Sequence, residues 1–152
     1  MITYHLEDDH FVFEAIKTLL SKHSNTKQIH LVRLATESDF RQKLSEIIEA
    51  SPSWILLDSM VSWSRPVENP PAMPPEVTEA GYYESGLRCA SLLREQGYLG
   101  TIVFYSVLGE DWVKERVESH QIGNPYEVLS KSEDHESLMQ VLLKLQTQAA
   151  LE

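Results

Sequence analysis

Polar side chains that could share one chemical task follow strand-like segments at four places in the chain. They are Glu7, Asp8, Asp58, Ser106 and Lys131. Three carboxylates gathered at one site repel one another and favour a hard divalent cation such as Mg²⁺, which prefers oxygen ligands. A carboxylate can also act as a nucleophile and form an aspartyl phosphate, while an ammonium group and a hydroxyl stabilise the phosphoryl oxygens. Each of these residues alone is ordinary, and only their conjunction at strand ends indicates this chemistry.

The segments that would position these side chains alternate between strand-like and helix-like patterns. We expect strands over residues 2–6, 29–34, 54–57, 101–106 and 126–130, each followed by a helix, over residues 11–20, 38–48, 86–96, 110–120 and 136–148. The run Trp54–Leu57 is continuously apolar, which is typical of a strand buried on both faces of a parallel sheet. The alternation predicts an α/β fold, a (βα)5 flavodoxin-like three-layer sandwich with a parallel five-stranded sheet in the order 2-1-3-4-5. In that order the carboxyl ends of the first and third strands are neighbours, where such sheets bind ligands.

The composition limits the possible classes of function. The 152 residues, 42% of them hydrophobic, suit one globular domain, which we place at residues 1–148. A net charge of −10 argues against direct binding of nucleic acid. No apolar run approaches the roughly 20 residues of a membrane span, and the first residues lack a signal-peptide pattern, so we expect a cytoplasmic setting without membrane contact. We expect residues 149–152 to be a tail, with Leu151-Glu152 a candidate cloning remnant, and the single cysteine, Cys89, to be a core residue.

Residues 61–83 interrupt the alternation of strands and helices. This segment holds five of the seven prolines, namely Pro66, Pro70, Pro71, Pro74 and Pro75. The spacing of the prolines predicts a long loop without regular elements, partly of polyproline type. Loops of this length are usually functional or mobile, so the insertion would cover the site or form a contact surface of its own. A tolerated surface insertion is the alternative, because added loop length costs little free energy.

Five short motifs occur in an order that is typical of one protein family. They are Leu6-Glu7-Asp8-Asp9, Trp54-Ile55-Leu56-Leu57-Asp58, Gly86-Leu87 with Leu92-Leu93-Arg94, Thr101-Ile102-Val103-Phe104-Tyr105-Ser106, and Leu129-Ser130-Lys131. Together they resemble the receiver domain of two-component response regulators, over about residues 1–148. The resemblance implies a stand-alone signalling domain of a phosphorelay rather than an enzyme in its own right.

The resemblance also implies a role for each residue of the set. Glu7, Asp8 and Asp58, with the backbone carbonyl of Met60, would hold Mg²⁺. Asp58 would accept the phosphoryl group from a sensor histidine kinase or a histidine phosphotransfer protein. Lys131 would contact that group, and Ser106 would move toward it and transmit the signal to a downstream protein. Homodimerisation is common among receiver domains and is a further expectation from the resemblance.

The chain departs from the receiver pattern at four places. The usual proline shortly after the phosphoacceptor is missing from Met60-Val61-Ser62, and Ser132 stands where a proline usually follows the lysine. Val128 occupies the position of the switch aromatic on the last strand, and Val107 is bulkier than the usual Ala or Gly. These departures leave open a second reading, a receiver-like module that binds proteins without being phosphorylated.

For each class of enzyme with the same predicted sheet, one position or motif in the sequence argues against it. A phosphatase of the haloacid-dehalogenase type needs a second Asp two residues after its nucleophile, and that position is Met60. A flavodoxin needs a phosphate-binding loop after the first strand, where Glu7-Asp8-Asp9 would repel a phosphate. A Rossmann enzyme would show G-x-G-x-x-G at the same turn, which is absent from the sequence.

Overall fold

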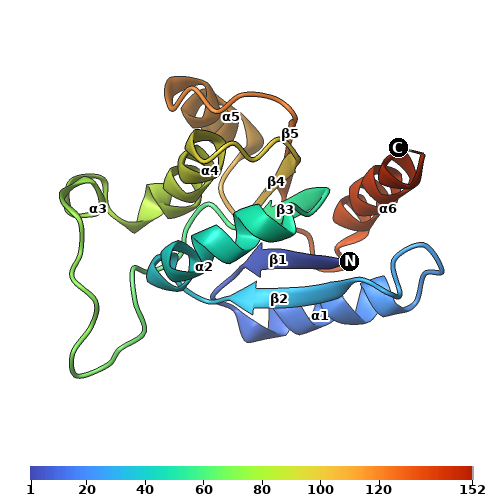
Figure 1. Ribbon diagram of the computed structural model, residues 1–152, viewed down its shortest axis with the longest axis horizontal. Helices are drawn as coiled ribbons and strands as arrows, with labels where there is room; N and C mark the ends of the chain where they lie inside the picture. Colours follow the sequence, from blue (N-terminus) through green and yellow to red (C-terminus); the bar gives the residue numbers. More distant parts are fainter. Residues whose placement is uncertain (152) are drawn as a thin grey trace.

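The computed structural model describes residues 1–151 and consists of a five-stranded sheet between two layers of helices (Figure 1). The elements are β1 (Ile2–Leu6), α1 (His10–Ser21), β2 (His30–Leu34), α2 (Glu37–Ala50), β3 (Trp54–Leu57), α3 (Pro75–Ala80), the 3-10 turn η1 (Tyr82–Glu84), α4 (Ser85–Glu95), β4 (Thr101–Ser106), α5 (Glu110–Ser119), β5 (Tyr126–Ser130) and α6 (Glu136–Ala150). All strand pairs are parallel and the order is β2-β1-β3-β4-β5. The predicted fold class and strand order are therefore confirmed.

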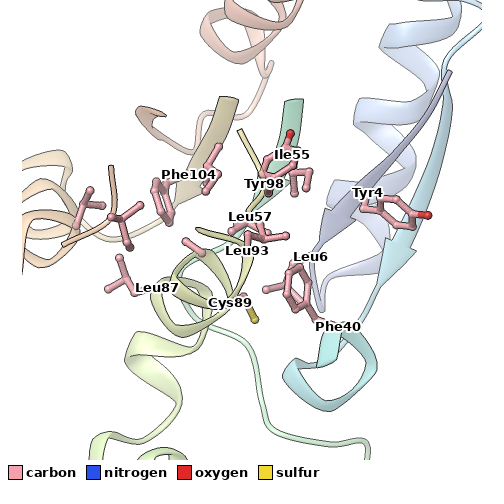
Figure 2. Packing of buried hydrophobic residues seen from close by; sticks show 14 of the residues in the cluster. Tyr4, Leu6, Phe40, Ile55, Leu57, Leu87, Cys89, Leu93, Tyr98 and Phe104 are labelled. Atoms are coloured by element: carbon pink, nitrogen blue, oxygen red, sulfur yellow. The ribbon is translucent and has the colours of Figure 1, made fainter. Parts of the chain in front are cut away.

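The alternation of side chains along β3 explains why helices cover both faces of the sheet. Ile55 and Leu57 point to one face, where they pack with residues of α2, α4 and α5 (Figure 2). Trp54 and Leu56 point to the other face and pack with residues of α1 and α6. All four side chains are fully buried. Successive residues of a strand project to opposite faces, so a continuously apolar strand requires an apolar layer on each side.

The core on the α2–α4 side includes the single cysteine. Cys89 is fully buried, and in Figure 2 its side chain points from α4 toward Phe40 of α2. Burial raises the pKa of its thiol well above the ordinary value, and the charge of Glu37 raises it further. The expectation that Cys89 is a core residue is confirmed.

Capping residues fix where the first two helices begin. The Asp9 carboxylate accepts hydrogen bonds from the backbone N–H groups of Phe11 and Val12, at 2.9 and 3.3 Å. Thr36 caps α2 by accepting from the N–H of Asp39 at 3.1 Å. Side-chain oxygens at this position satisfy N–H groups that the first helical turn leaves free. Asp9 is thus engaged by its own helix, whereas its neighbours Glu7 and Asp8 remain at the end of β1.

Two sequence predictions about the elements are wrong. The proline-rich segment was expected to hold no regular element, but α3 occupies Pro75–Ala80 and η1 begins at Tyr82. Proline is tolerated in the first turn of a helix, where its missing N–H would have no partner, and Pro75 stands at that position with Pro74 as N-cap. The last helix was expected to end at residue 148, but it continues through Ala150; of the expected tail, Glu152 lies outside the described residues.

The remainder of the insertion, between β3 and α3, extends away from the sheet as an open loop beyond α2 (Figure 1). Within residues 1–151 no helix has the length and apolar character needed to cross a membrane.

Candidate functional site

The fold brings three carboxylates together at the carboxyl end of the sheet. Leu6 of β1 and Leu57 of β3 are paired in register, so the residues that follow them emerge side by side. Glu7, Asp8 and Asp58 each offer an oxygen within 4.8 Å of the others. The backbone fixes this position, because the N–H of Asp58 donates to the carbonyl of Leu6 at 2.9 Å. Glu7 and Asp58 are buried, whereas Asp8 is exposed, so the cluster opens to solvent on the side of Asp8.

Lys131 lies against two of these carboxylates. Its Nζ is 2.7 Å from Oε1 of Glu7 and 2.9 Å from Oδ2 of Asp58. Its backbone N–H donates to the carbonyl of Ser106 at 2.8 Å, which fixes the chain at the end of β5 against the end of β4. The ammonium group therefore links the residues that follow β1 and β3, although Lys131 stands 73 positions after Asp58 in the chain.

The charges at the site are unbalanced. Burial, with the nearby charge of Asp58, raises the pKa of Glu7 to about 8, although Lys131 acts in the opposite direction. Burial alone would lower the pKa of Lys131, but the carboxylates of Asp58 and Glu7 outweigh it and raise that pKa. Because the raised pKa shows that a negative charge on Glu7 is unfavourable here, a cation bound at the cluster would favour the ionised form of this carboxyl group.

The donor set fits a hard divalent cation. Carboxylate oxygens from three residues converge, and Asp8 leaves one side of the cluster accessible to solvent. Mg²⁺ is commonly held in this way, by a few carboxylates together with water. Of the predicted ligands, Met60 is half-buried and its N–H donates to Oδ1 of Asp58 at 3.1 Å, which places its backbone directly beside the carboxylate.

Ser106 is brought to the same end of the sheet but is paired with another hydroxyl. Its Oγ lies 2.5 Å from Oγ of Ser59 and also accepts from the N–H of Leu108 at 3.0 Å. Both serines are buried. Ser59 was not singled out from the sequence, although its place directly after Asp58 was the available signal. The pair links the segment after β3 to the end of β4.

The first turn of α4 packs directly on the backbone of the site. Gly86 N–H donates to the carbonyl of Ser59 at 3.0 Å, and Ser85 Oγ accepts from the N–H of Val61 at 2.7 Å. A Cβ on Gly86 would lie 2.1 Å from the carbonyl oxygen of Asp58 and 2.7 Å from Cα of Ser59. Only glycine allows this approach of helix to loop, so Gly86 determines how closely α4 supports Asp58.

Arg33 was also missed from the sequence. It stands on β2 and donates from Nε to the carbonyl of Glu7 at 2.9 Å, and from Nη2 to the carbonyl of Asp8 at 2.7 Å. These bonds hold the backbone that carries two of the three carboxylates. Position 33 reads as one polar residue in an alternating edge strand, which gives no signal of such a contact.

A buried cluster of charges, formed by Glu37, Arg88 and Arg41, joins the insertion to the helices beside the site. Glu37 is fully buried and binds Arg88 through two hydrogen bonds, of 2.9 and 2.6 Å, and Arg41 through one of 3.0 Å. Arg41 also forms an ion pair with Glu76 of α3 at 3.2 Å. Its guanidinium lies 5.5 Å from the centre of the Trp63 ring. We name Glu37, Arg88 and Arg41 the Glu37 cluster.

The start of the insertion is bound to the same helix. The backbone N–H groups of Glu37 and Ser38 donate to the carbonyls of Ser62 and Trp63, at 3.0 and 2.8 Å. Trp63 Nε1 donates in turn to the carbonyl of Pro71 at 2.8 Å. The N–H groups at the start of α2 that lack partners within the helix are thereby satisfied by the insertion.

The comparison with solved structures identifies the fold. No protein-family model matches the sequence, and no curated protein matches it. Among solved structures, the receiver domain of a Francisella response regulator superposes with a TM-score of 0.63 at 15% identity, over 97% of this chain and 98% of that one. The beryllofluoride-activated NtrC receiver domain has a TM-score of 0.58 at 12% identity, over 97% and 94% of the two chains. A LuxR-family two-component response regulator from Aurantimonas has a TM-score of 0.62 at 13% identity, over 97% and 85%.

Nearly the whole chain thus has the fold of response-regulator receiver domains. The residues that the resemblance nominated stand together at the carboxyl end of this sheet: Glu7, Asp8, Asp58, Ser106 and Lys131. At identities this low the likeness is one of fold.

Proposed function

We propose that the chain is a receiver domain that accepts a phosphoryl group on Asp58 in a Mg²⁺-dependent transfer. The observation that carries the proposal is the contact of Lys131 Nζ with both Glu7 and Asp58 inside a three-carboxylate cluster. An ammonium group beside a carboxylate nucleophile stabilises the negative charge of an incoming phosphoryl group. The receiver fold of the chain supports this reading, and signalling rather than turnover of a substrate is then its role.

The transfer uses the residues as follows. The P–N bond of a phosphohistidine breaks, its electron pair returns to the imidazole nitrogen, and a P–O bond forms to a carboxylate oxygen of Asp58. Oδ1 and Oδ2 of Asp58 are oriented by the N–H of Met60 and by Lys131, which hold the nucleophile in place. Glu7, Asp8, Asp58 and the carbonyl of Met60 would hold Mg²⁺, which would supply positive charge for the phosphoryl oxygens. Lys131 would neutralise the remaining negative charge of the phosphoryl group. The Ser106 hydroxyl would break its hydrogen bond with Ser59 and bind a phosphoryl oxygen instead.

The proposal includes a protein that donates the phosphoryl group and a downstream protein that responds to it. A sensor histidine kinase or a histidine phosphotransfer protein would supply the phosphoryl group, and a downstream protein would bind the modified form. A cytoplasmic setting, a homodimer and a single signalling domain over residues 1–148 with the 61–83 insertion remain predictions. The second reading, binding without phosphorylation, is an outcome of the experiment that follows.

We expect the wild-type chain to gain one phosphoryl group from acetyl phosphate in the presence of Mg²⁺, measured as the mass of the intact protein. Asp58→Asn should gain none, because the amide is no nucleophile toward phosphorus at this site. Asp9→Asn is the matched control, since Asp9 binds the N–H groups of α1 and lies outside the cluster. A wild-type chain that binds Mg²⁺ and gains no mass would refute phosphorylation and favour the binding module.

Mg²⁺ should stabilise the folded chain. A ligand that binds only the folded state raises the free energy of unfolding by about 2.7 kcal/mol when its concentration is 100 times its dissociation constant. Asp8→Asn should weaken this stabilisation, because it removes one of the converging carboxylates. Asp9→Asn should leave it unchanged, since asparagine caps a helix as well as aspartate does. Thermal unfolding at increasing Mg²⁺ measures the effect, and equal stabilisation of the Asp8 variant would exclude Asp8 as a ligand.

A further inference from the structure

A hydroxyl group on β4 holds the backbone immediately after Lys131. Tyr105 Oη accepts a hydrogen bond from the N–H of Ser132 at 3.1 Å and lies 2.6 Å from Nδ1 of His135. The tyrosine ring is fully buried, packed in the core on the α1–α6 side of the sheet. Because its ring cannot move without disturbing that core, the hydroxyl is a fixed point for the segment that follows β5.

Consecutive residues of β4 thus bind consecutive residues after β5. The carbonyl of Ser106 accepts from the N–H of Lys131, and the hydroxyl of Tyr105 accepts from the N–H of Ser132. Residues 132–134 are otherwise exposed and lie outside helices and strands. The first bond holds the backbone directly before the Lys131 side chain, and the second holds it directly after.

His135 supports the same hydroxyl from the far end of this short loop. It is buried, and it precedes the first residue of α6 with a positive φ of 55°. Burial lowers the pKa of His135, against the effect of Asp134, which favours the neutral ring, and Nδ1 of a neutral ring can accept a hydrogen bond from the tyrosine hydroxyl. The hydroxyl can therefore accept from Ser132 and donate to His135 at once.

We propose that Tyr105, supported by His135, is a positioning residue that holds Lys131 against Glu7 and Asp58 for phosphoryl transfer. The inference rests on the proposed function, and it adds a residue to which the receiver resemblance assigned no role. It also accounts for how Lys131 is held when Ser132, rather than a proline, follows it.

The test compares Tyr105→Phe with Tyr98→Phe. Both changes remove a buried tyrosine hydroxyl, but the hydroxyl of Tyr98 donates to the carbonyl of Pro52 at 2.8 Å, away from the site. We expect Tyr105→Phe to lower the rate of phosphorylation by acetyl phosphate at saturating Mg²⁺ by roughly tenfold, the change expected for one lost hydrogen bond. The Mg²⁺ dissociation constant should stay the same, because the carboxylates come from β1 and β3. Tyr98→Phe should leave both quantities unchanged.

Two further measurements separate positioning from general weakening. In a Lys131→Ala background, Tyr105→Phe should cause no additional loss of rate, because the residue acts through Lys131. Hydrogen exchange of the Ser132 amide, followed by NMR, should be faster in Tyr105→Phe and unchanged in Tyr98→Phe. Equal losses of rate in the two tyrosine variants, or an undiminished effect in the Lys131→Ala background, would overturn the inference.

The outcomes also distinguish the inference from the proposed function. If the wild-type chain gains no phosphoryl group, the proposed function fails and the positioning of Lys131 for transfer fails with it, whatever the exchange rates show. If the wild type is phosphorylated while Tyr105→Phe keeps its rate, the proposed function stands and the inference alone is overturned.

Discussion

Replacing Arg88 with methionine is expected to lower the free energy of unfolding by about 3–5 kcal/mol, the usual cost of removing one partner of a buried ion pair. Glu37 is fully buried, and Arg88 supplies two of its three hydrogen bonds from arginine side chains. Without Arg88, the bond from Arg41 is the one side-chain hydrogen bond within residues 1–151 that this carboxylate would keep. Denaturation by urea, followed by circular dichroism, measures the change.

The matched control lies on the same helix. Lys43 and Glu46 of α2 form an ion pair at 3.5 Å, but their side chains are 50% and 62% exposed. Lys43→Met should therefore change the free energy of unfolding by less than about 1 kcal/mol. A double variant, Glu37→Leu with Arg88→Met, should recover much of the loss, because no unpaired charge is left behind. An Arg88→Met variant as stable as the Lys43 control would mean that Glu37 is not buried as described.

Replacing Gly86 with alanine is expected to damage both stability and phosphorylation. Helix propensity alone favours alanine by about 1 kcal/mol. The new methyl group would nevertheless lie 2.1 Å from the carbonyl oxygen of Asp58, and this backbone atom cannot rotate away as a side chain can. We expect a net destabilisation of about 1–3 kcal/mol, as for other overpacked sites. Displacement of Asp58 by about 1 Å would slow phosphorylation by roughly a hundredfold.

Gly109 provides the control for Gly86. It is the N-cap of α5 with a φ of −61°, and a Cβ there would meet no atom within 4 Å. Gly109→Ala should lower the free energy of unfolding by roughly 0.5–1 kcal/mol, because alanine is a poorer N-cap than glycine, and should leave the rate of phosphorylation intact. Urea denaturation and the mass gained over time from acetyl phosphate would be measured on both variants. If Gly86→Ala behaved like Gly109→Ala, α4 could not abut Asp58 as closely as the structure shows.

The sheet and the acidic cluster were predictable because their signals are local. Four of the five strands lead directly into a polar residue, and a parallel sheet gathers the carboxyl ends of its strands at one edge. The predicted order of the strands places Asp58 beside Glu7 and Asp8. The residue types at the ends of β4 and β5 completed the set with Ser106 and Lys131.

The contacts that hold the site together were not predictable, because they join residues far apart in the chain. Glu37 and Arg88 are separated by 51 positions, and each reads as an ordinary charge on an amphipathic helix. Tyr105 reads as one more apolar member of a buried strand, and its hydroxyl acquires a partner only when the loop after β5 lies over it. The short helix α3 was missed because a proline cluster was read as excluding helix, although Pro75 suits a first turn.

The Glu37 cluster has a consequence for the ancestry of the insertion. Loops are generally the parts of a fold that are gained and lost independently of the rest. This one supplies Glu76 to Arg41 and Ser62 to the backbone of Glu37, while Arg41 and Glu37 belong to α2 and Arg88 belongs to α4. In a relative that lacks the insertion, the charged side chain at position 37 would lose the loop that covers it. Residues 37, 41 and 88 should therefore be inherited or replaced together with the loop, as one heritable unit.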